Sequence, residues 1–189
     1  YGIINEELKK LLAFKDTSKY DLIFSKVLSK SLSITQGTFT IDVGLKKNIK
    51  PGMAVVDANG LIGIIYSSSD EFSIVRTLKN TNLKLTVKDE RSRIQGILKW
   101  NGNELVITNL PKTSDIKPGD RIIISELSTL INLPLPVGIV TKIINPEKGI
   151  FNDVVIKPFT DLVKVENVFV IKTIPSKIIN EQELNFFKN

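Results

Sequence analysis

The side chains that most often carry out catalysis are missing from this chain, which contains no histidine and no cysteine. A Ser-His-Asp triad, a thiolate nucleophile and a zinc site built on His or Cys ligands are therefore excluded. An enzyme would have to use carboxylates, a Ser–Lys pair or an activated threonine. The one Ser-x-x-Lys sequence, residues 114–117, comes directly before a Pro-Gly turn, where we expect both side chains to lie in solvent.

Two further polar stretches could suggest chemistry, but neither completes a site. Residues 16–18 read Asp-Thr-Ser, as in an aspartic protease, yet no second copy supplies the partner carboxylate. Residues 89–93 are a run of charges between two expected strands, and we interpret them as a solvated hairpin. Neither a phosphate-binding glycine loop nor a calcium loop is present. The residues therefore predict a protein that is not an enzyme and uses no cofactor or metal.

The chain is basic, with a formal net charge of +6 and a pI near 9.4. A basic β-barrel module that binds nucleic acid is therefore our alternative function. The lysines are spread along the chain, however, and Trp100 is the one aromatic residue beside a basic one at a strand end. Packing is the favoured role for Trp100, and we expect Phe24, Phe39, Phe72 and Phe169 in the core. We therefore expect no nucleic-acid partner.

The first sixteen residues predict an amphipathic helix. Ile4, Leu8 and Leu11 recur with spacings of four and three, which is the seam of a coiled coil, and Lys15 occupies the next seam position. Acidic residues precede basic ones, as the helix dipole favours. We predict that these four residues form a homodimer seam; a helix docked on its own domain is the alternative.

The rest of the chain reads as short β-branched segments separated by Gly, Pro, Asn and Asp, which is typical of strands. The expected strands are 22–28, 38–43, 53–57, 61–66, 72–78, 83–88, 94–100, 104–110, 120–125, 137–144, 153–158 and 166–172. Twelve strands with hardly a helix between them predict an all-β fold of barrels or sandwiches.

An internal repeat indicates two similar β-domains. The Ile-Lys-Pro-Gly sequence at residues 49–52 recurs at 116–119, and each copy precedes an apolar strand and then a strand built around glycine. Pro-Gly is also a common hairpin device, so a coincidence is the alternative. We assign a set of glycines to turns or to close strand packing, and none to binding: Gly44, Gly52, Gly63, Gly119 and Gly138.

The stretch from residue 127 to 136 is apolar but lacks strand alternation, and its two prolines prevent regular pairing. Such a loop is either tucked under its own barrel, which we favour, or presented to a partner. Leu130, Ile131 and Leu133 are our candidates for a partner contact. The tail from 176 to 189 is either a docked amphipathic helix or a disordered end.

The order and spacing of these elements resemble the extracytoplasmic part of the bacterial rod shape-determining family MreC. The resemblance covers nearly the whole chain, and its motifs are Pro-Gly-Met-Ala-Val-Val at 51–56, Gly-Leu-Ile-Gly at 60–63, residues 119–125, Pro-Val-Gly at 136–138 and residues 158–162. The chain departs from the family pattern at Glu126, where glycine is common, and across 131–136. The shape of that loop is therefore open.

The resemblance implies two six-stranded β-barrels of the trypsin-like type without catalytic residues, preceded by a short helix that ends a coiled coil. We expect the helix at 1–16, the first barrel at 17–80 plus 150–175, the second at 81–149 and a tail at 176–189.

The resemblance also implies a function and a location. This would be a cell-shape scaffold that organises lateral peptidoglycan synthesis, self-associates as a homodimer or larger assembly, and binds a class B penicillin-binding protein together with MreD and MreB. It would lie on the periplasmic side of the inner membrane, anchored by a segment upstream of Tyr1.

Overall fold

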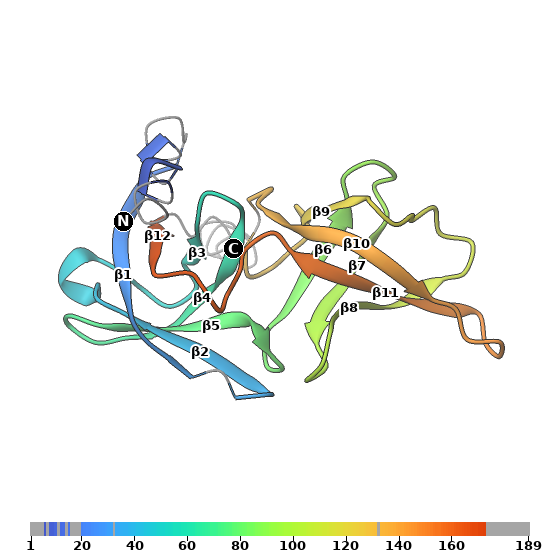
Figure 1. Ribbon diagram of the computed structural model, residues 1–189, viewed down its shortest axis with the longest axis horizontal. Helices are drawn as coiled ribbons and strands as arrows, with labels where there is room; N and C mark the ends of the chain where they lie inside the picture. Colours follow the sequence, from blue (N-terminus) through green and yellow to red (C-terminus); the bar gives the residue numbers. More distant parts are fainter. Residues whose placement is uncertain are drawn as a thin grey trace, which may run out of the picture.

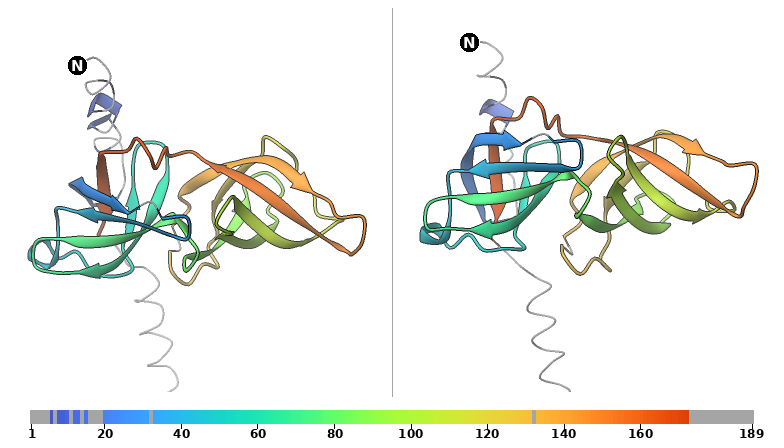
Figure 2. Two further views of the ribbon diagram at one scale, coloured as in Figure 1. Left: turned by 60° about the horizontal axis from the view of Figure 1, so that its bottom comes forward. Right: turned by 90° about the horizontal axis from the view of Figure 1, so that it is seen from below.

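The computed structural model contains two closed, six-stranded β-barrels that lie side by side (Figures 1 and 2). It describes residues 6, 8–10, 12, 13, 15, 20–31, 33–131 and 133–172. The described residues between 6 and 15 are helical and lie against the first barrel. The all-β class and the two six-stranded barrels are confirmed, and each of the twelve expected strands has a counterpart.

The first barrel is built from the first five strands and the last one, in the order β1-β12-β3-β4-β5-β2. Its strands are β1 (Leu22–Ser31), β2 (Gln36–Ile41), β3 (Ala54–Val56), β4 (Leu61–Ser68), β5 (Ser73–Asn80) and β12 (Asn167–Ile171), and a short 3-10 helix, η1, spans Leu45–Lys47.

The second barrel has the order β10-β11-β8-β7-β6-β9. Its strands are β6 (Lys84–Asp89), β7 (Gln95–Trp100), β8 (Leu105–Pro111), β9 (Arg121–Ile124), β10 (Pro136–Ile144) and β11 (Phe151–Pro158).

Alternation along the strands explains why each barrel closes around an apolar core. In β2, Phe39 and Ile41 are buried while Thr38 and Thr40 are half-exposed. In β6, Leu85 is buried whereas Lys84 points to solvent. Because successive side chains point to opposite faces of a strand, this pattern places one apolar row inside the barrel. β12 is buried on both faces, since the helix covers its outer side.

The sequence repeat corresponds to matching hydrogen bonds in the two barrels. The amide of Gly52 donates to Ile65 O at 2.8 Å, and that of Gly119 donates to Val140 O at 2.8 Å. Both glycines follow proline in a turn and have φ near +95°, at 95° and 93°. That conformation is open to glycine but strained for other residues. The β3–β4 hairpin and the β9–β10 hairpin are therefore equivalent.

The other three glycines of the predicted set lie where backbone segments approach closely. A Cβ at Gly63 would lie 2.0 Å from Arg76 O, and one at Gly138 would lie 2.3 Å from Lys157 O. A Cβ at Gly44 would lie 2.1 Å from Ser69 O. No side chain fits at any of these three positions without a shift of the backbone.

One expected domain boundary is wrong. We expected the segment from 150 onward, including strand 153–158, to return to the first barrel, but β11 pairs with β10 and β8 of the second. Only β12 crosses back, pairing with β1 and β3. β11 is drawn into the second barrel because a hairpin joins it to β10, and local antiparallel pairing is the simplest connection available.

Several contacts between described residues join the barrels. Trp100 Nε1 donates a hydrogen bond to Ile34 O at 2.6 Å, and the hydroxyl of Thr160 donates to Leu61 O at 3.3 Å. Gly60 approaches so closely that a Cβ there would lie 2.6 Å from Pro136 O. Trp100 therefore has a packing role at the junction, where Lys79 also lies over its ring.

Candidate interaction site

The loop predicted to contact a partner is mostly folded under the second barrel. Ile131 is only 2% exposed and Leu135 is buried, whereas Leu130 is 43% exposed and Leu133 is half-buried. The hydroxyl oxygen of Ser128 accepts a hydrogen bond from the amide of Ile131 at 3.3 Å. Ile131 therefore anchors the loop, as the tucked arrangement that we favoured requires, and its buried side chain makes it a poor candidate for the partner contact for which we had named it.

A buried cation holds the start of this loop. The side chain of Lys88, on β6, is 7% exposed and forms an ion pair with Glu126, the residue at which the chain departs from the family pattern. The hydrogen bond from Lys88 lowers the pKa of the Glu126 carboxyl. Beyond this anchor, Leu127 is 65% exposed. Leu127 and Leu130 therefore form an exposed apolar tip on a fixed base, which we call the loop tip.

The charge run at 89–93 is more ordered than the solvated hairpin we expected. Asp89 is fully buried, and its Oδ1 accepts hydrogen bonds from the amides of Arg91 at 2.8 Å and Ser92 at 3.4 Å. The guanidinium of Arg91 binds both Asp115 and Asp120, with two N–O distances of 2.8 Å. This carboxyl network ties the β6–β7 hairpin to the turn before β9.

Burial and the neighbouring Asp120 raise the pKa of Asp89 above its ordinary value. The hydrogen bonds from Arg91 instead lower the pKa of Asp120 and of Asp115. Asp89 Oδ2 makes no hydrogen bond to a donor in the described part of the chain. A hydrogen bond with the Asp120 side chain would contribute to the raised pKa of Asp89. Within the described residues, no group of three acidic side chains is arranged to hold a metal ion.

The described residues of the predicted dimer seam face the chain's own first barrel. Leu8 and Lys15, together with Leu12, line a pocket against Phe24 of β1 and Phe169 of β12. The rings of Phe24 and Phe169 meet edge to face, with centroids 5.8 Å apart. Ile4 and Leu11 lie outside the described residues. The structure thus shows the helix docked on its own domain, which was our alternative interpretation.

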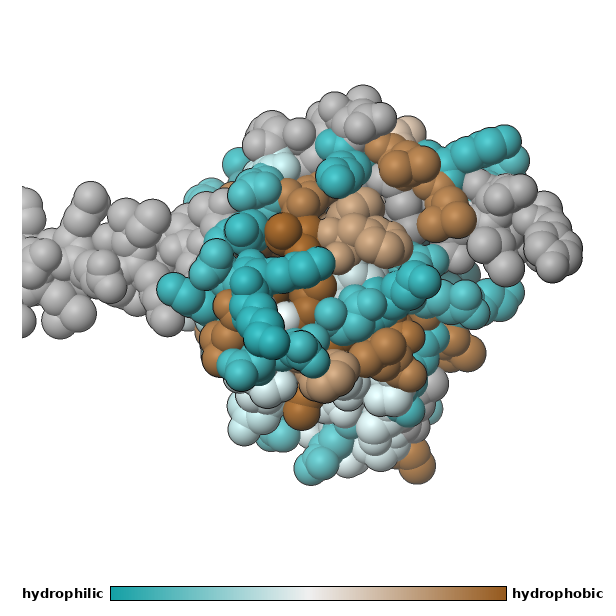
Figure 3. All heavy atoms as spheres, turned by 90° about the vertical axis from the view of Figure 1, so that its left-hand side faces the viewer, coloured by the Kyte–Doolittle hydropathy of each residue, from teal (hydrophilic) through white to brown (hydrophobic). Residues whose placement is uncertain are grey.

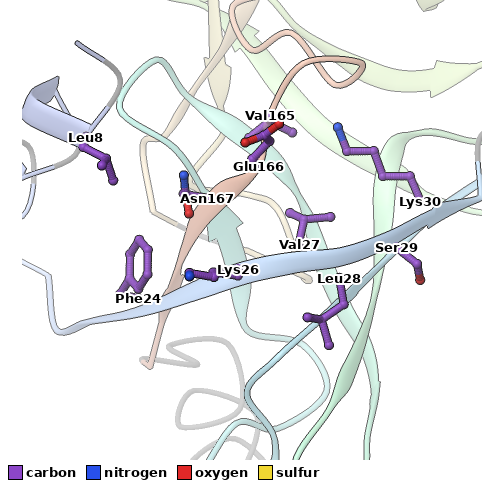
Figure 4. A pocket seen from close by; sticks show the side chains of 10 residues that line it. All are labelled: Leu8, Phe24, Lys26, Val27, Leu28, Ser29, Lys30, Val165, Glu166 and Asn167. Carbon is purple, nitrogen blue, oxygen red and sulfur yellow. The ribbon is translucent and has the colours of Figure 1, made fainter. Parts of the chain in front are cut away.

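Beside the helix runs a groove that the sequence did not reveal. It has a volume of about 770 Å³ and is lined by Leu8, by β1 and by the segment leading into β12 (Figure 4). Phe24, which we expected in the core, faces Leu8 across the groove and is 38% exposed. Lys26 and Lys30 lie on the β1 side, and Glu166 lies on the opposite side. We call this feature the β1 groove.

The expectation for the other phenylalanines is right for two and wrong for one. Phe39 and Phe169 are buried, whereas Phe72 lies in the tight turn between β4 and β5 and is exposed. On the end of the molecule formed by the first barrel, apolar side chains are interspersed with polar ones (Figure 3). In the first barrel, Arg76 of β5 lies over the ring of Tyr66 of β4, 3.7 Å from its centroid, and Tyr66 is 52% exposed.

No helix among the described residues is long and apolar enough to cross a membrane.

A family model described as rod shape-determining protein MreC, barrel core, matches residues 27–172, which include strands of both barrels. The cell shape-determining protein MreC of Listeria monocytogenes is 25% identical over 175 residues, covering 89% of this chain and 59% of that protein. The Haemophilus influenzae protein of the same name is 28% identical over 170 residues, covering 88% of this chain and 48% of that protein. The chain therefore spans about half of the length of these curated relatives.

Solved structures show the same fold. One named MreC superimposes with a TM-score of 0.83 at 24% identity, covering 90% of this chain and 98% of that one. A complex between a penicillin-binding protein (PBP2) and MreC from Helicobacter pylori aligns with a TM-score of 0.60 at 18% identity, covering 81% of this chain and 100% of that one.

Proposed function

Because the chain belongs to the MreC family of rod shape-determining proteins, we propose that it is a non-enzymatic scaffold of the machinery that builds the lateral cell wall. The observation that carries this proposal is the family match across both barrels, from residue 27 to 172. A rigid pair of barrels with exposed apolar features suits a protein that works by contact.

The proposed partner is a class B penicillin-binding protein. The Helicobacter pylori complex of PBP2 with MreC supports this choice, since its MreC has the same fold. By binding an active conformation of that enzyme better than its resting one, the scaffold would shift the population toward activity. Self-association, MreD, MreB and a membrane anchor upstream of Tyr1 belong to the same proposal, which places the barrels on the outer side of the inner membrane.

The loop tip is the proposed contact. Leu127 and Leu130 are exposed on a loop that Ile131 and the Lys88–Glu126 pair hold in place, so a partner would meet a preorganised surface. Leu133 is half-buried and packs against the core.

The test is binding of this chain to the extracytoplasmic domain of the class B penicillin-binding protein from the same organism. We expect saturable binding in the micromolar range or tighter, weakened at least about tenfold, or ~1.4 kcal/mol, by Leu130→Asp. Ile150→Asp is the matched control, because Ile150 is 71% exposed in the connection between β10 and β11, outside the loop tip. Absence of binding, or binding only to a DNA oligomer with a steep salt dependence, would contradict the proposal.

A further inference from the structure

Two lysines face each other on the outer surface of the second barrel. Lys84 of β6 lies directly opposite Lys99 of β7 in the antiparallel register, so both side chains point to the same face of the sheet. That face is the outer one, because the neighbouring Leu85 and Leu98 belong to the buried core. Like charges directly opposite each other destabilise a strand pair. The stability of the barrel therefore does not account for this pair of lysines.

The pair also lacks the carboxylate partners that other cations of this barrel have. Four other basic side chains of the second barrel form ion pairs: Lys88, Arg91, Arg121 and Lys142. Lys142 lies on the same outer row as Lys99, two strands further on, and its amine is 3.2 Å from Glu104. Within the described part of the chain, neither Lys84 nor Lys99 forms an ion pair. Their positive charges are therefore left for a partner outside the chain.

A third amine lies beside the residue that follows Lys99. β5 of the first barrel lies against β7, and the amine of Lys79 is 5.6 Å from the centroid of the Trp100 ring. Trp100 is held in place by its hydrogen bond to Ile34 O at 2.6 Å. The positive charge at this junction is therefore carried by a base to which both barrels contribute, and such preorganisation lowers the entropy lost on binding.

The chemistry of this surface suits a polymer that carries many separate negative charges. All three cations are lysines, which act as compact point charges, whereas bidentate recognition of one carboxylate or phosphate uses the planar guanidinium of arginine. Lys84 is exposed, and Lys79 and Lys99 are half-buried, so the amines lie on an open surface. Charges spread over an open surface gain most from a partner whose own charges repeat.

We infer that Lys79, Lys84 and Lys99, which we call the junction lysines, bind peptidoglycan through the carboxylates of its peptides. These peptides repeat along the glycan strands, so their carboxylates form the kind of polyanion that the surface suits. The choice of peptidoglycan among polyanions rests on the proposed function, in which the chain works beside the wall that its partners build. Contact with the wall would hold the scaffold where new material is inserted.

Co-sedimentation with purified sacculi, the intact peptidoglycan layers of cells, tests the inference. The sacculi are first stripped of phosphodiester polymers. One portion is then amidated, which converts the peptide carboxylates to neutral amides. We expect the natural chain to sediment with the untreated sacculi at physiological salt and not with the amidated ones. Equal sedimentation with both portions, or with neither, would overturn the inference.

A pair of substitutions tests the junction lysines themselves. Lys84→Gln with Lys99→Gln removes two of the charges; Lys47→Gln with Lys148→Gln lowers the net charge equally at exposed positions in η1 and in the β10–β11 connection. We expect the half-saturation concentration on sacculi to rise about fivefold for the junction pair and to stay within about twofold for the control pair. The junction variant should unfold at the same or a higher urea concentration, because a like-charge contact is removed. Equal weakening by both pairs would overturn the site.

Binding to the penicillin-binding protein separates this inference from the proposed function. The loop tip is intact in the junction variant, so that variant should bind the enzyme domain as the natural chain does. A natural chain that binds the enzyme domain but not sacculi would refute only the wall contact, whereas binding to sacculi alone would contradict only the proposed enzyme partner. Binding to a poly(glycerol phosphate) chain but not to stripped sacculi would overturn peptidoglycan as the ligand.

Discussion

The two barrels have the same cyclic order of strands but take their sixth strand from opposite ends. In the first barrel, β1 to β5 are completed by β12, which comes last in the chain; in the second, β7 to β11 are completed by β6, which comes first. β12 pairs with β1 and β3 as β6 pairs with β7 and β9. Along the chain, β6 comes directly after β1 to β5 of the first barrel, and β12 comes directly after β7 to β11 of the second. Each half of the chain, β1 to β6 or β7 to β12, therefore gives its last strand to the barrel built from the other half.

This exchange links the two small barrels to each other through the chain itself. The chain crosses between the barrels twice, after β5 and after β11, and the described contacts of Trp100 and Gly60 lie at the same junction. The first barrel cannot close until the second has been synthesised, whereas the second barrel is continuous in sequence. Pairing strands that are distant in sequence loses chain entropy on loop closure before the stabilising contacts form, which slows folding.

The barrels also differ in what they bury. The first barrel buries neutral polar groups that bond to backbone carbonyls: Ser73 donates to Val43 O at 2.7 Å, and Thr77 donates to Gly37 O at 2.9 Å. The second buries Lys88 and Asp89 at the end of β6. Buried ionisable groups need compensation: Lys88 pairs with Glu126, whereas burial raises the pKa of the Asp89 carboxyl, so the stability of this end of the second barrel depends on pH.

The largest expected effect is on isolated halves of the chain. Residues 82–160 contain all six strands of the second barrel and should fold alone, whereas residues 20–81 lack β12 and should stay unfolded. Placing residues 161–172 before residue 21 through an Asn-Gly turn should restore the first barrel, because Ile171 lies opposite Leu22. Circular dichroism and amide chemical-shift dispersion measure this. Folding of residues 20–81 alone would show that β12 is not needed for closure.

Two matched substitutions test whether β4 and β10 are structurally equivalent. Gly63→Ala and Gly138→Ala each push a Cβ against a backbone carbonyl, so each should lower the free energy of unfolding by about 1–3 kcal/mol in urea denaturation. Ser29→Ala, on an exposed position of β1, is the control and should change stability by less than about 0.5 kcal/mol. A large effect at one glycine only would break the equivalence.

A smaller effect is expected at the junction. Trp100→Phe keeps most of the ring but removes the hydrogen bond to Ile34 O, which should cost about 0.5–1.5 kcal/mol of unfolding free energy. Tyr66→Phe, whose ring lies away from the junction, serves as the control. Urea denaturation gives the free energies of unfolding. An unchanged denaturation midpoint for Trp100→Phe would mean that the hydrogen bond of Trp100 does not contribute to stability and that the other junction contacts are sufficient to hold the barrels together.

The smallest effect should appear as a pH dependence confined to the second barrel. The raised pKa of Asp89 means that the folded state binds its proton more tightly than the unfolded state does. The free energy of unfolding therefore falls as the pH rises from the ordinary pKa of an aspartate to the raised pKa of Asp89. Asp89→Asn can accept the same backbone hydrogen bonds and donate to Asp120, so it should gain stability relative to the natural chain as pH rises from 4 to 7. Ser73→Ala in the first barrel should shift stability equally at both pH values. Parallel pH profiles for Asp89→Asn and the natural chain would contradict this account.

The strands themselves could be predicted from the sequence. Alternation in β2 and β6 and the Pro-Gly turns before β3 and β9 are local signals, and they correctly indicated twelve strands. The internal repeat indicated two similar β-domains, and the family resemblance implied that both are barrels. The family could also be recognised, because its motifs keep their order along the chain. The charge run at 89–93 is the expected hairpin with Glu90, Arg91 and Arg93 exposed, but the sequence did not show that Asp89 caps this hairpin from a buried position.

Only the tertiary structure decided which strands meet. The sequence of β11 is compatible with either barrel, and its hairpin with β10 and its register with β8 settle the choice. Ile131 and Phe24 are equally apolar in the sequence, yet one is buried and the other lines a groove. The physical reason is that alternation and turn chemistry act over a few residues, whereas burial depends on neighbours brought together from distant parts of the chain.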